Sequence, residues 1–218
     1  MLYVNRLISV KWYVWPMLEN ERARTRREEY TEATRQALLA AGRHVFASEG
    51  YQAAGIETIS RAARVTRGAF YHHFEDKKAL FDAVVVALQA ETTAKIEERG
   101  RSQRKIWDRM NVGIDAYLDA CLEPAYARIV IQEAPAVLGN KRYRDIEEAY
   151  PMALLTASLN ALKRDGELDF EDIDLLSRMV DAMICKVALM LPEADNPKKL
   201  RERGQKIIGS LLGVFRRK

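Results

Sequence analysis

The fold of this chain is decided by residues 56–81, which read IETISRAARVTRGAFYHHFEDKKALF. Phe70 and Phe74 are four positions apart and therefore share one face of a helix. Arg67 and Tyr71 have the same spacing and share a different face. Because phenyl rings favour burial, the face with the cation and the phenol is predicted to point outward. The pattern indicates a short helix that is anchored by its rings and presents polar groups to another molecule.

The residues just before this helix complete a structural unit. Ile59, Ala63 and Val65 supply small apolar contacts that let two short helices cross closely through a brief turn. Such a pair is a helix-turn-helix, whose second helix enters the major groove of DNA. Thr66 is a good N-cap for that second helix. A tight turn is predicted at Arg64-Val65.

The rest of the chain predicts helices and no sheet. No segment alternates with period two for long enough to form a strand, and glycine and proline separate the apolar segments. The predicted fold class is all-α, with about nine helices in total. A helix-turn-helix three-helix DNA-binding domain comes first, and a larger helical domain follows. The predicted helices cover residues 26–49, 56–63, 67–73, 75–99, 103–121, 124–136, 141–165, 170–190 and 197–215.

Three parts of the chain are expected to have different roles. Residues 1–25 are expected to be an extension with partial order or none, and Met17 is a candidate for the natural start. An interfacial or dimer-contacting arm is the alternative for this extension. Residues 26–82 are expected to form the DNA-binding domain, with the helix-turn-helix motif at about 55–74. Residues 83–218 are expected to bind a ligand and to dimerise.

Composition narrows the possible classes of protein. Of the 218 residues, 48% are hydrophobic and 30% are charged, with a net charge of +4 that does not by itself indicate nucleic acid. The apolar start is too short for a membrane span and lacks a secretory cleavage pattern. We therefore expect a cytoplasmic protein without membrane contact. Cys121 and Cys185 are expected to be reduced thiols.

The sequence contains no pattern typical of a catalytic or metal site. His72 and His73 are adjacent, so they point about 100° apart on a helix, and His44 stands alone. Cys-x-x-Cys pairs, glycine-rich phosphate loops and nucleophile elbows are absent from the sequence. We expect no enzyme activity, no metal and no cofactor.

With these residues in view, the chain resembles the tetracycline-repressor (TetR) family of bacterial transcription regulators. The resemblance covers about residues 30–85 and implies a ligand-responsive regulator of transcription, most simply a repressor. The chain departs from the family pattern at Gly55, where the family often has a threonine or serine cap, and at Arg64, where it commonly has glycine. The resemblance thus implies a left-handed turn at Arg64, at a cost of about 1 kcal/mol. The features that carry the resemblance are Gly50-Tyr51, the run at 56–81, the aromatic and histidine residues at 70–74, Lys77 and the pair Leu80-Phe81.

The resemblance implies that double-stranded DNA is the main partner and that Lys77 contacts a phosphate. For His72, contact with DNA and an ordinary surface position both remain open. His73 shares the phenylalanine face and is expected to pack inside. The residues predicted to bind DNA are Arg61, Arg64, Thr66, Arg67, Gly68, Ala69, Tyr71, His72 and Lys77.

A single helix-turn-helix reads only a few base pairs, so useful affinity requires a dimer that reads successive major grooves, about 34 Å apart. Two apolar late helices from each subunit can form a four-helix bundle; packing within one subunit's core is the alternative. The residues predicted to form this homodimer interface are Ile173, Leu176, Val180, Ile184, Ile207 and Leu211.

The second half of the chain is expected to bind a small-molecule effector of unknown identity and partly apolar character. Aromatic and sulfur-containing side chains along residues 103–121 can line an apolar pocket, and this helix is also predicted to transmit the effect of binding. The predicted lining residues are Trp107, Met110, Tyr117 and Cys121. Two other classes remain open: a helical binding protein or enzyme without an operator, and a structural DNA-binding protein without a ligand.

Overall fold

The computed structural model describes residues 26–217, apart from the side chain of Arg27, and within them the chain is helical without β-strands. The predicted extension over residues 1–25 lies outside this part. The all-α prediction is confirmed.

None of the described helices is both long enough and apolar enough to span a bilayer. In chain order they are α2 (Arg26–Glu49), α3 (Ile56–Ala62), α4 (Arg67–His73), α5 (Lys77–Gly100), α6 (Ile106–Ala120), α7 (Pro124–Tyr126), the π-helix η2 (Ala127–Glu133), α8 (Ala134–Leu138), α9 (Asn140–Ala149), α10 (Pro151–Arg164), α11 (Ile173–Met190), the 3-10 helix η3 (Leu191–Glu193) and α12 (Pro197–Gly213).

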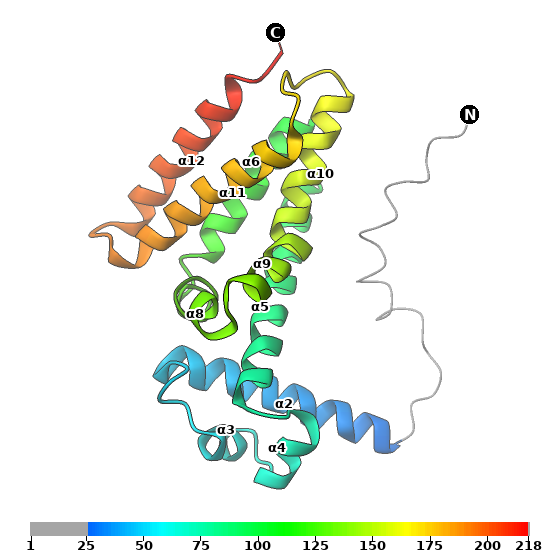
Figure 1. Cartoon of the computed structure of the whole chain (residues 1–218), viewed down its shortest axis with the longest axis vertical. Coiled ribbons are helices and arrows are strands. Elements are labelled where there is room, and N and C mark those ends of the chain that lie inside the picture. The colour runs from blue at the N-terminus through cyan, green and yellow to red at the C-terminus, as the bar shows by residue number, and fades with distance from the viewer. Residues whose placement is uncertain (1–25, 218) are drawn as a thin grey trace.

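Helices α2, α3 and α4 form the lower part of the molecule in Figure 1, and local backbone features set their ends. Gly50 follows α2 with a φ of 83°, a left-handed conformation that glycine adopts without strain. Arg64 has a φ of 57°, which confirms the left-handed turn predicted there. The hydroxyl of Thr66 accepts a hydrogen bond from the backbone N–H of Ala69 at 3.1 Å, as an N-cap does.

Aromatic rings anchor α4 to its neighbours. Phe70 and Phe74 are buried, and the guanidinium carbon of Arg35 on α2 lies 4.9 Å from the centroid of the Phe74 ring. The opposite face of α4, which carries Tyr71, is exposed. The predicted division of this helix into a buried ring face and an outward polar face is therefore confirmed.

Helix α5 runs through both parts of the molecule (Figure 1). Leu80 and Phe81 near its start are buried in the lower part, and Ile96 near its end is buried in the upper bundle. The upper bundle contains α6, α10, α11 and α12, with α11 and α12 side by side on its outer edge. A movement of the upper bundle can therefore reach the lower part along one continuous helix.

Two segments that were predicted to be single helices are divided. The segment at 141–165 breaks between Ala149 and Pro151, because proline lacks the N–H that would continue the preceding helix and its ring clashes with the previous turn. The segment at 124–136 contains the π-helix η2, in which hydrogen bonds join residues five apart.

The predicted interface on α11 is wrong. Its four residues are buried within the chain's own core, because α11 has apolar side chains on two faces and periodicity alone does not show which face the subunit covers. The four residues are Ile173, Leu176, Val180 and Ile184.

The other apolar face of α11 is exposed, and α12 extends it. At Gly204 on α12, a Cβ atom would lie 2.7 Å from Cγ1 of Val187, so glycine allows the two helices to pack closely. Ile207 and Leu211, which the sequence also predicted at the interface, are 59% and 46% exposed. We call this surface the α11–α12 face; its exposed apolar residues are Leu175, Met179, Leu189, Met190, Ile207, Leu211 and Val214.

Candidate nucleic-acid interface and internal cavity

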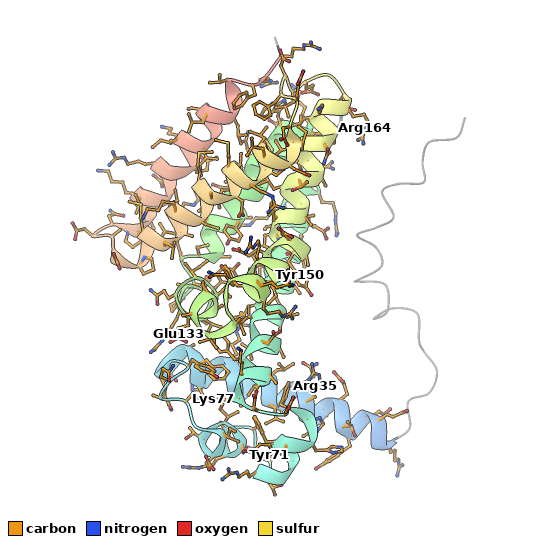
Figure 2. The ribbon with its side chains drawn as sticks, viewed as in Figure 1. Arg35, Tyr71, Lys77, Glu133, Tyr150 and Arg164 are labelled. Atoms are coloured by element: carbon orange, nitrogen blue, oxygen red, sulfur yellow. The ribbon has the colours of Figure 1, made fainter. Side chains whose placement is uncertain are left out.

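The exposed face of α4 holds a cation in a fixed position. The Arg67 guanidinium donates a hydrogen bond to the Glu57 carboxylate at 2.5 Å and another to the Tyr71 hydroxyl at 3.3 Å. The bond to Tyr71, followed by the nearby Glu57 charge, raises the pKa of Arg67. The Arg67 side chain is 62% exposed, and Tyr71 lies at the lower end of the molecule (Figure 2). An ion pair and a hydrogen bond thus hold the guanidinium at the surface of α4, and guanidinium groups are among those that contact phosphates and base edges.

Two exposed residues flank this pair. Gly68 and His72 leave open space in front of α4: among the described atoms, a Cβ at Gly68 would meet only Oγ1 of Thr66, at 3.8 Å. Packing inside the protein therefore does not require a glycine at this position. A small residue there instead leaves room for the backbone of a partner molecule to approach the helix.

The other predicted DNA contacts lie around the turn before α4. Arg61 and Arg64 are exposed, whereas Ala69 is half-buried. Thr66 uses its hydroxyl to cap α4. The structure places these side chains at one end of the molecule, and their contact with DNA remains a prediction.

The structure gives Lys77 a different role from the predicted phosphate contact. Its ammonium donates to the carbonyl oxygens of Tyr51, Gln52 and Ala54 at 2.7, 3.3 and 2.8 Å and lies 4.5 Å from the centroid of the Tyr51 ring. An ammonium has three donors, and all three are used here. We therefore correct the prediction: in this structure Lys77 holds together the connection between α2 and α3.

The same connection is held from its other side by η2. The Arg128 guanidinium donates to the carbonyl oxygens of Ala47 and Ser48 at 3.0 and 2.8 Å, and the Glu133 carboxylate accepts from the Tyr51 N–H at 3.0 Å. Figure 2 shows Glu133 at the end of α2. The last carbonyls of a helix lack partners within the helix, so η2 supplies them. We call these contacts the η2 clamp.

The π-helical backbone makes the η2 clamp possible. In an α-helix, residues five positions apart point about 140° away from one another. In a π-helix, whose hydrogen bonds join residues five apart, they lie on the same side, and the Nε atom of Arg128 is 3.6 Å from Oε1 of Glu133. Neither residue could be predicted from the sequence, because a spacing of five matches no ordinary helical or strand pattern.

We expect Arg128→Met to weaken the junction between α2 and η2 specifically. The change keeps most of the aliphatic stem and removes hydrogen bonds from a charged donor, so the free energy of unfolding should fall by about 1–2 kcal/mol. Urea unfolding measures the loss, and amide exchange at Gly50 and Tyr51 locates it. Arg43→Met is the matched control, because Arg43 forms a surface ion pair with Glu91 and should lose less than about 1 kcal/mol. Equal losses in the two variants would contradict this role for η2.

The upper bundle encloses a cavity of about 660 Å³ between α5, α6, α10 and α11. Of the predicted lining residues, Met110 and Tyr117 face this cavity. Trp107 and Cys121 do not, so that part of the prediction is corrected: the Trp107 ring packs beneath Arg216, with 5.5 Å from the guanidinium carbon to the ring centroid, and Cys121 is buried at the end of α6. The full lining is Ile96, Glu97, Gly100, Arg101, Ile106, Arg109, Met110, Gly113, Ile114, Tyr117, Pro151, Met152, Leu154, Leu155, Ala157, Ser158, Ala161, Arg164, Asp181 and Ile184.

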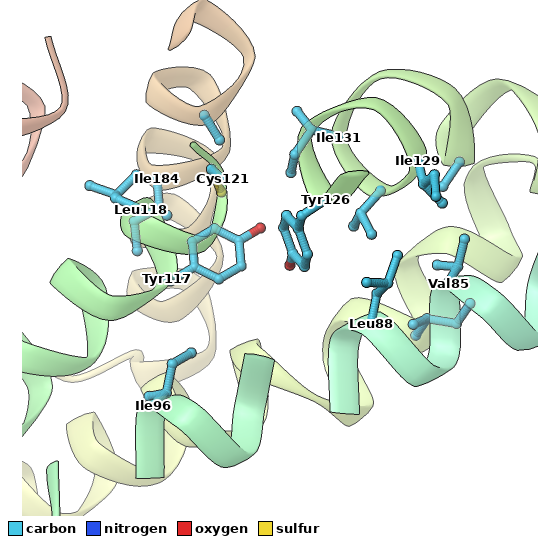
Figure 3. Close-up of a cluster of buried hydrophobic side chains, with 14 of the residues drawn as sticks. Val85, Leu88, Ile96, Tyr117, Leu118, Cys121, Tyr126, Ile129, Ile131 and Ile184 are labelled. Atoms are coloured by element: carbon cyan, nitrogen blue, oxygen red, sulfur yellow. The ribbon is translucent and has the colours of Figure 1, made fainter. Parts of the chain in front are cut away.

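Next to the cavity-lining Tyr117, a second tyrosine packs in the core (Figure 3). The rings of Tyr117 and Tyr126 meet edge to face at 6.2 Å, and the Tyr126 hydroxyl donates to Oε1 of Gln89 at 2.7 Å. Cys121 and Cys185 are free thiols, and burial raises the pKa of each. Raised pKa values keep both thiols protonated and unreactive.

A half-buried carboxylate lies next to these tyrosines. Oε1 of Glu147 is 3.7 Å from Sγ of Cys185, and burial, followed by the Asp181 charge, raises the pKa of Glu147 to about 7. The unfolded chain loses this proton near its ordinary value of 4.5, whereas the folded chain keeps it until about pH 7. The stability that this residue contributes is therefore complete below pH 4.5 and is lost as the pH rises toward 7.

We expect Glu147→Gln to remove this pH dependence. At pH 8 the variant should be more stable than the parent protein by on the order of 2 kcal/mol, and at pH 5 the two should nearly agree. Urea unfolding at a series of pH values measures both differences. Glu98→Gln, which changes an exposed carboxylate, is the control and should leave the pH profile of the parent protein unchanged. If the stability of Glu147→Gln depended on pH in the same way as that of the parent protein, Glu147 would not be the source of this pH dependence.

Comparison with known proteins identifies the family of this arrangement. Residues 38–84 match the family described as bacterial regulatory proteins, tetR family, and residues 107–214 match the tetracyclin repressor-like C-terminal domain. The crystal structure of a TetR-family transcriptional regulator from Pectobacterium atrosepticum is similar at 30% identity and a TM-score of 0.73, covering 89% of this chain and 99% of that one. The chain belongs to the TetR family.

Other members extend the comparison. The Transposon Tn10 TetC protein of Escherichia coli is 28% identical over 193 residues, which are 87% of this chain and 92% of that protein. The structure of RolR in complex with resorcinol has a TM-score of 0.67 at 18% identity, covering 85% of this chain and 90% of that one, and shows a similar fold. This TetR-family protein is thus a transcriptional regulator whose DNA-binding part contains α3 and α4.

Proposed function

We propose that this TetR-family regulator binds a palindromic operator as a homodimer and that a small molecule in the cavity releases it. The observation that carries the proposal is the exposed face of α4, where Arg67 and Tyr71 are held together outside a helix anchored by buried rings. Repression by occupying a promoter is the simplest consequence of such binding. The cavity favours this function over that of a structural DNA-binding protein without a ligand, because the second half of such a protein would have a filled core.

The second subunit is proposed to cover the α11–α12 face. Monomeric proteins rarely expose large continuous apolar surfaces, and two adjacent helices supply this one. A second copy that presents the same two helices completes a four-helix bundle with twofold symmetry. The pairing sets two copies of α4 at a fixed separation, which a palindromic operator requires.

We propose that effector binding in the cavity acts on the lower part of the molecule through two connections and so releases the DNA. Ile96 and Tyr117 line the cavity from α5 and α6. Helix α5 continues down to the residues around α4, and α6 leads through α7 to the η2 clamp. An effector that binds more tightly to the arrangement in which the two α4 helices are misplaced shifts the population away from the DNA-bound form.

Titration of the protein against duplex DNA from the region upstream of its own coding sequence tests the proposal. The specific complex should be at least about 10³-fold tighter than that with a shuffled duplex at the same salt concentration, and both should weaken as salt rises. Gly68→Val places a side chain in the open space before α4. It should leave the thermal unfolding temperature nearly unchanged and abolish the specific complex. Equal affinity for the two duplexes at every salt concentration would reject operator binding.

A further inference from the structure

The cavity is a long slot. Its lining residues extend along α10 from Pro151 to Arg164 and along α6 from Ile106 to Tyr117. At 1.5 Å of rise per residue, the α10 side is about 20 Å long. The slot therefore suits an extended molecule better than a compact one.

Small side chains keep the slot open along its length. At Gly113 on α6 a Cβ would lie only 3.2 Å from Cγ2 of Ile96, so glycine lets α6 and α5 pack closely where both line the slot. Ala157 and Ala161 face the slot from α10. Apolar residues form most of the remaining wall. A flexible hydrocarbon chain fits these surroundings, because its burial is favourable and it needs no hydrogen bonds.

One end of the slot is basic. Arg101, Arg109 and Arg164 are exposed lining residues, and Glu97 is the exposed acid among them. In Figures 1 and 2, α10 ends at Arg164, at the same end of the bundle where α5 passes into α6. The connection over residues 99–109, RGRSQRKIWDR, adds further cations around this opening. The opening therefore attracts negative charge.

The arginines at the opening keep most of their donors available. Within residues 26–217, no carboxylate lies within 4.0 Å of Arg101, and the ion pair of Arg164 is a loose one to its neighbour Asp165, at 3.8 Å. Arg109 donates to the carbonyl oxygen of Gln103. Helix α6 also begins here without a side-chain cap, so the positive end of its dipole faces the same opening.

Asp181, the acid at the other end of the slot, does not favour a cationic ligand. Burial raises the pKa of Asp181, and the nearby Arg178 charge opposes this shift. Sγ of Cys185 lies 3.9 Å from its carboxylate. Arg178 is itself paired with Glu148 at 2.9 Å. A cationic ligand would meet the three arginines at the opening before it reached Asp181.

We propose that the effector is a long-chain amphiphile with an anionic head group, whose chain lies in the slot and whose head meets Arg101, Arg109 and Arg164. The inference rests on the proposed function of the cavity as the effector site. Guanidinium groups bind carboxylate and phosphate alike, so a free fatty acid and a phosphate-bearing thioester or ester of one share this chemistry.

Three ligands with the same chain and different heads test the sign of the charge. Myristate, myristyl alcohol and myristyltrimethylammonium, each below its micelle concentration, are titrated into the full-length protein by calorimetry. Myristate should bind on the order of tenfold more tightly than the alcohol, and the ammonium compound most weakly. Myristoyl-coenzyme A, compared with myristate, distinguishes the phosphate-bearing source from the free acid. Tighter binding of the ammonium compound would overturn the proposal.

Variants at the opening and in the wall of the slot complete the test. Arg101→Glu with Arg164→Glu should weaken myristate binding at least about tenfold and leave the alcohol unchanged, whereas Ala161→Phe should weaken both. Arg144→Glu, an exposed charge reversal on α9 outside the lining, is the control and should change neither. Unchanged myristate binding in the double variant would overturn the proposal. Operator binding without ligand is measured on the same samples, so failure of the ligand assignment and failure of DNA binding are separate results.

Discussion

Replacing Arg67 with alanine is expected to lower operator affinity by at least about thirtyfold, because the loss is about 1–3 kcal/mol in each half-site and a dimer engages two half-sites. The fold should survive, since the Arg67 side chain is 62% exposed and α4 is anchored by the buried Phe70 and Phe74. Gel-shift titration measures the affinity, and circular dichroism and sedimentation check helix content and assembly. Unchanged operator affinity in a folded protein would show that α4 is not the reading helix.

Neighbouring substitutions separate the parts of this surface. Tyr71→Phe keeps the ring and removes the hydroxyl that accepts from Arg67, so its loss of affinity should be smaller than that of Arg67→Ala. Glu57→Gln removes a carboxylate that competes with phosphate for the same guanidinium, so nonspecific affinity should rise. Arg144→Ala removes one positive charge from α9, far along the chain from the motif, and controls for the change in net charge.

Placing aspartate at both Met179 and Ile207 is expected to abolish dimerisation at micromolar concentration and, with it, specific operator binding. Twofold symmetry places each substitution in the interface twice, and a carboxylate buried without a partner costs several kcal/mol. The dissociation constant of the dimer should therefore rise by at least about 10³-fold. The folded subunit should persist, because both side chains are exposed in the single chain.

Analytical ultracentrifugation of the double variant measures the assembly directly. Tyr30→Asp, which changes an exposed side chain on α2 away from the α11–α12 face, should leave the oligomeric state of the parent protein unchanged. A double variant that sediments as the parent dimer would refute this choice of face. Monomers that keep full operator affinity would instead refute the need for a dimer in DNA binding.

The features of the DNA-binding part that could be predicted from the sequence depend on residues that are close together in the chain. The spacing of Phe70 and Phe74, the cap at Thr66 and the turn at Arg64 act within a few residues, so the sequence predicts them directly, and the structure agrees. Lys77 is the exception. Its ammonium reaches carbonyl oxygens more than twenty residues away, and no local pattern distinguishes that role from a phosphate contact.

In the upper bundle, tertiary packing decided what the sequence left open. Periodicity placed apolar residues on α11, but only its neighbours determine that Val180 faces the core while Met179 faces outward. The η2 clamp depends on a π-helical turn, and the slot depends on which faces of α6 and α10 meet. The sequence by itself therefore determined most of the helices, the cap at Thr66 and the polar face of α4, because these follow from interactions between near neighbours. Tertiary structure alone decided which face of α11 is exposed, the cavity and the η2 clamp, because these follow from contacts between residues far apart in the chain.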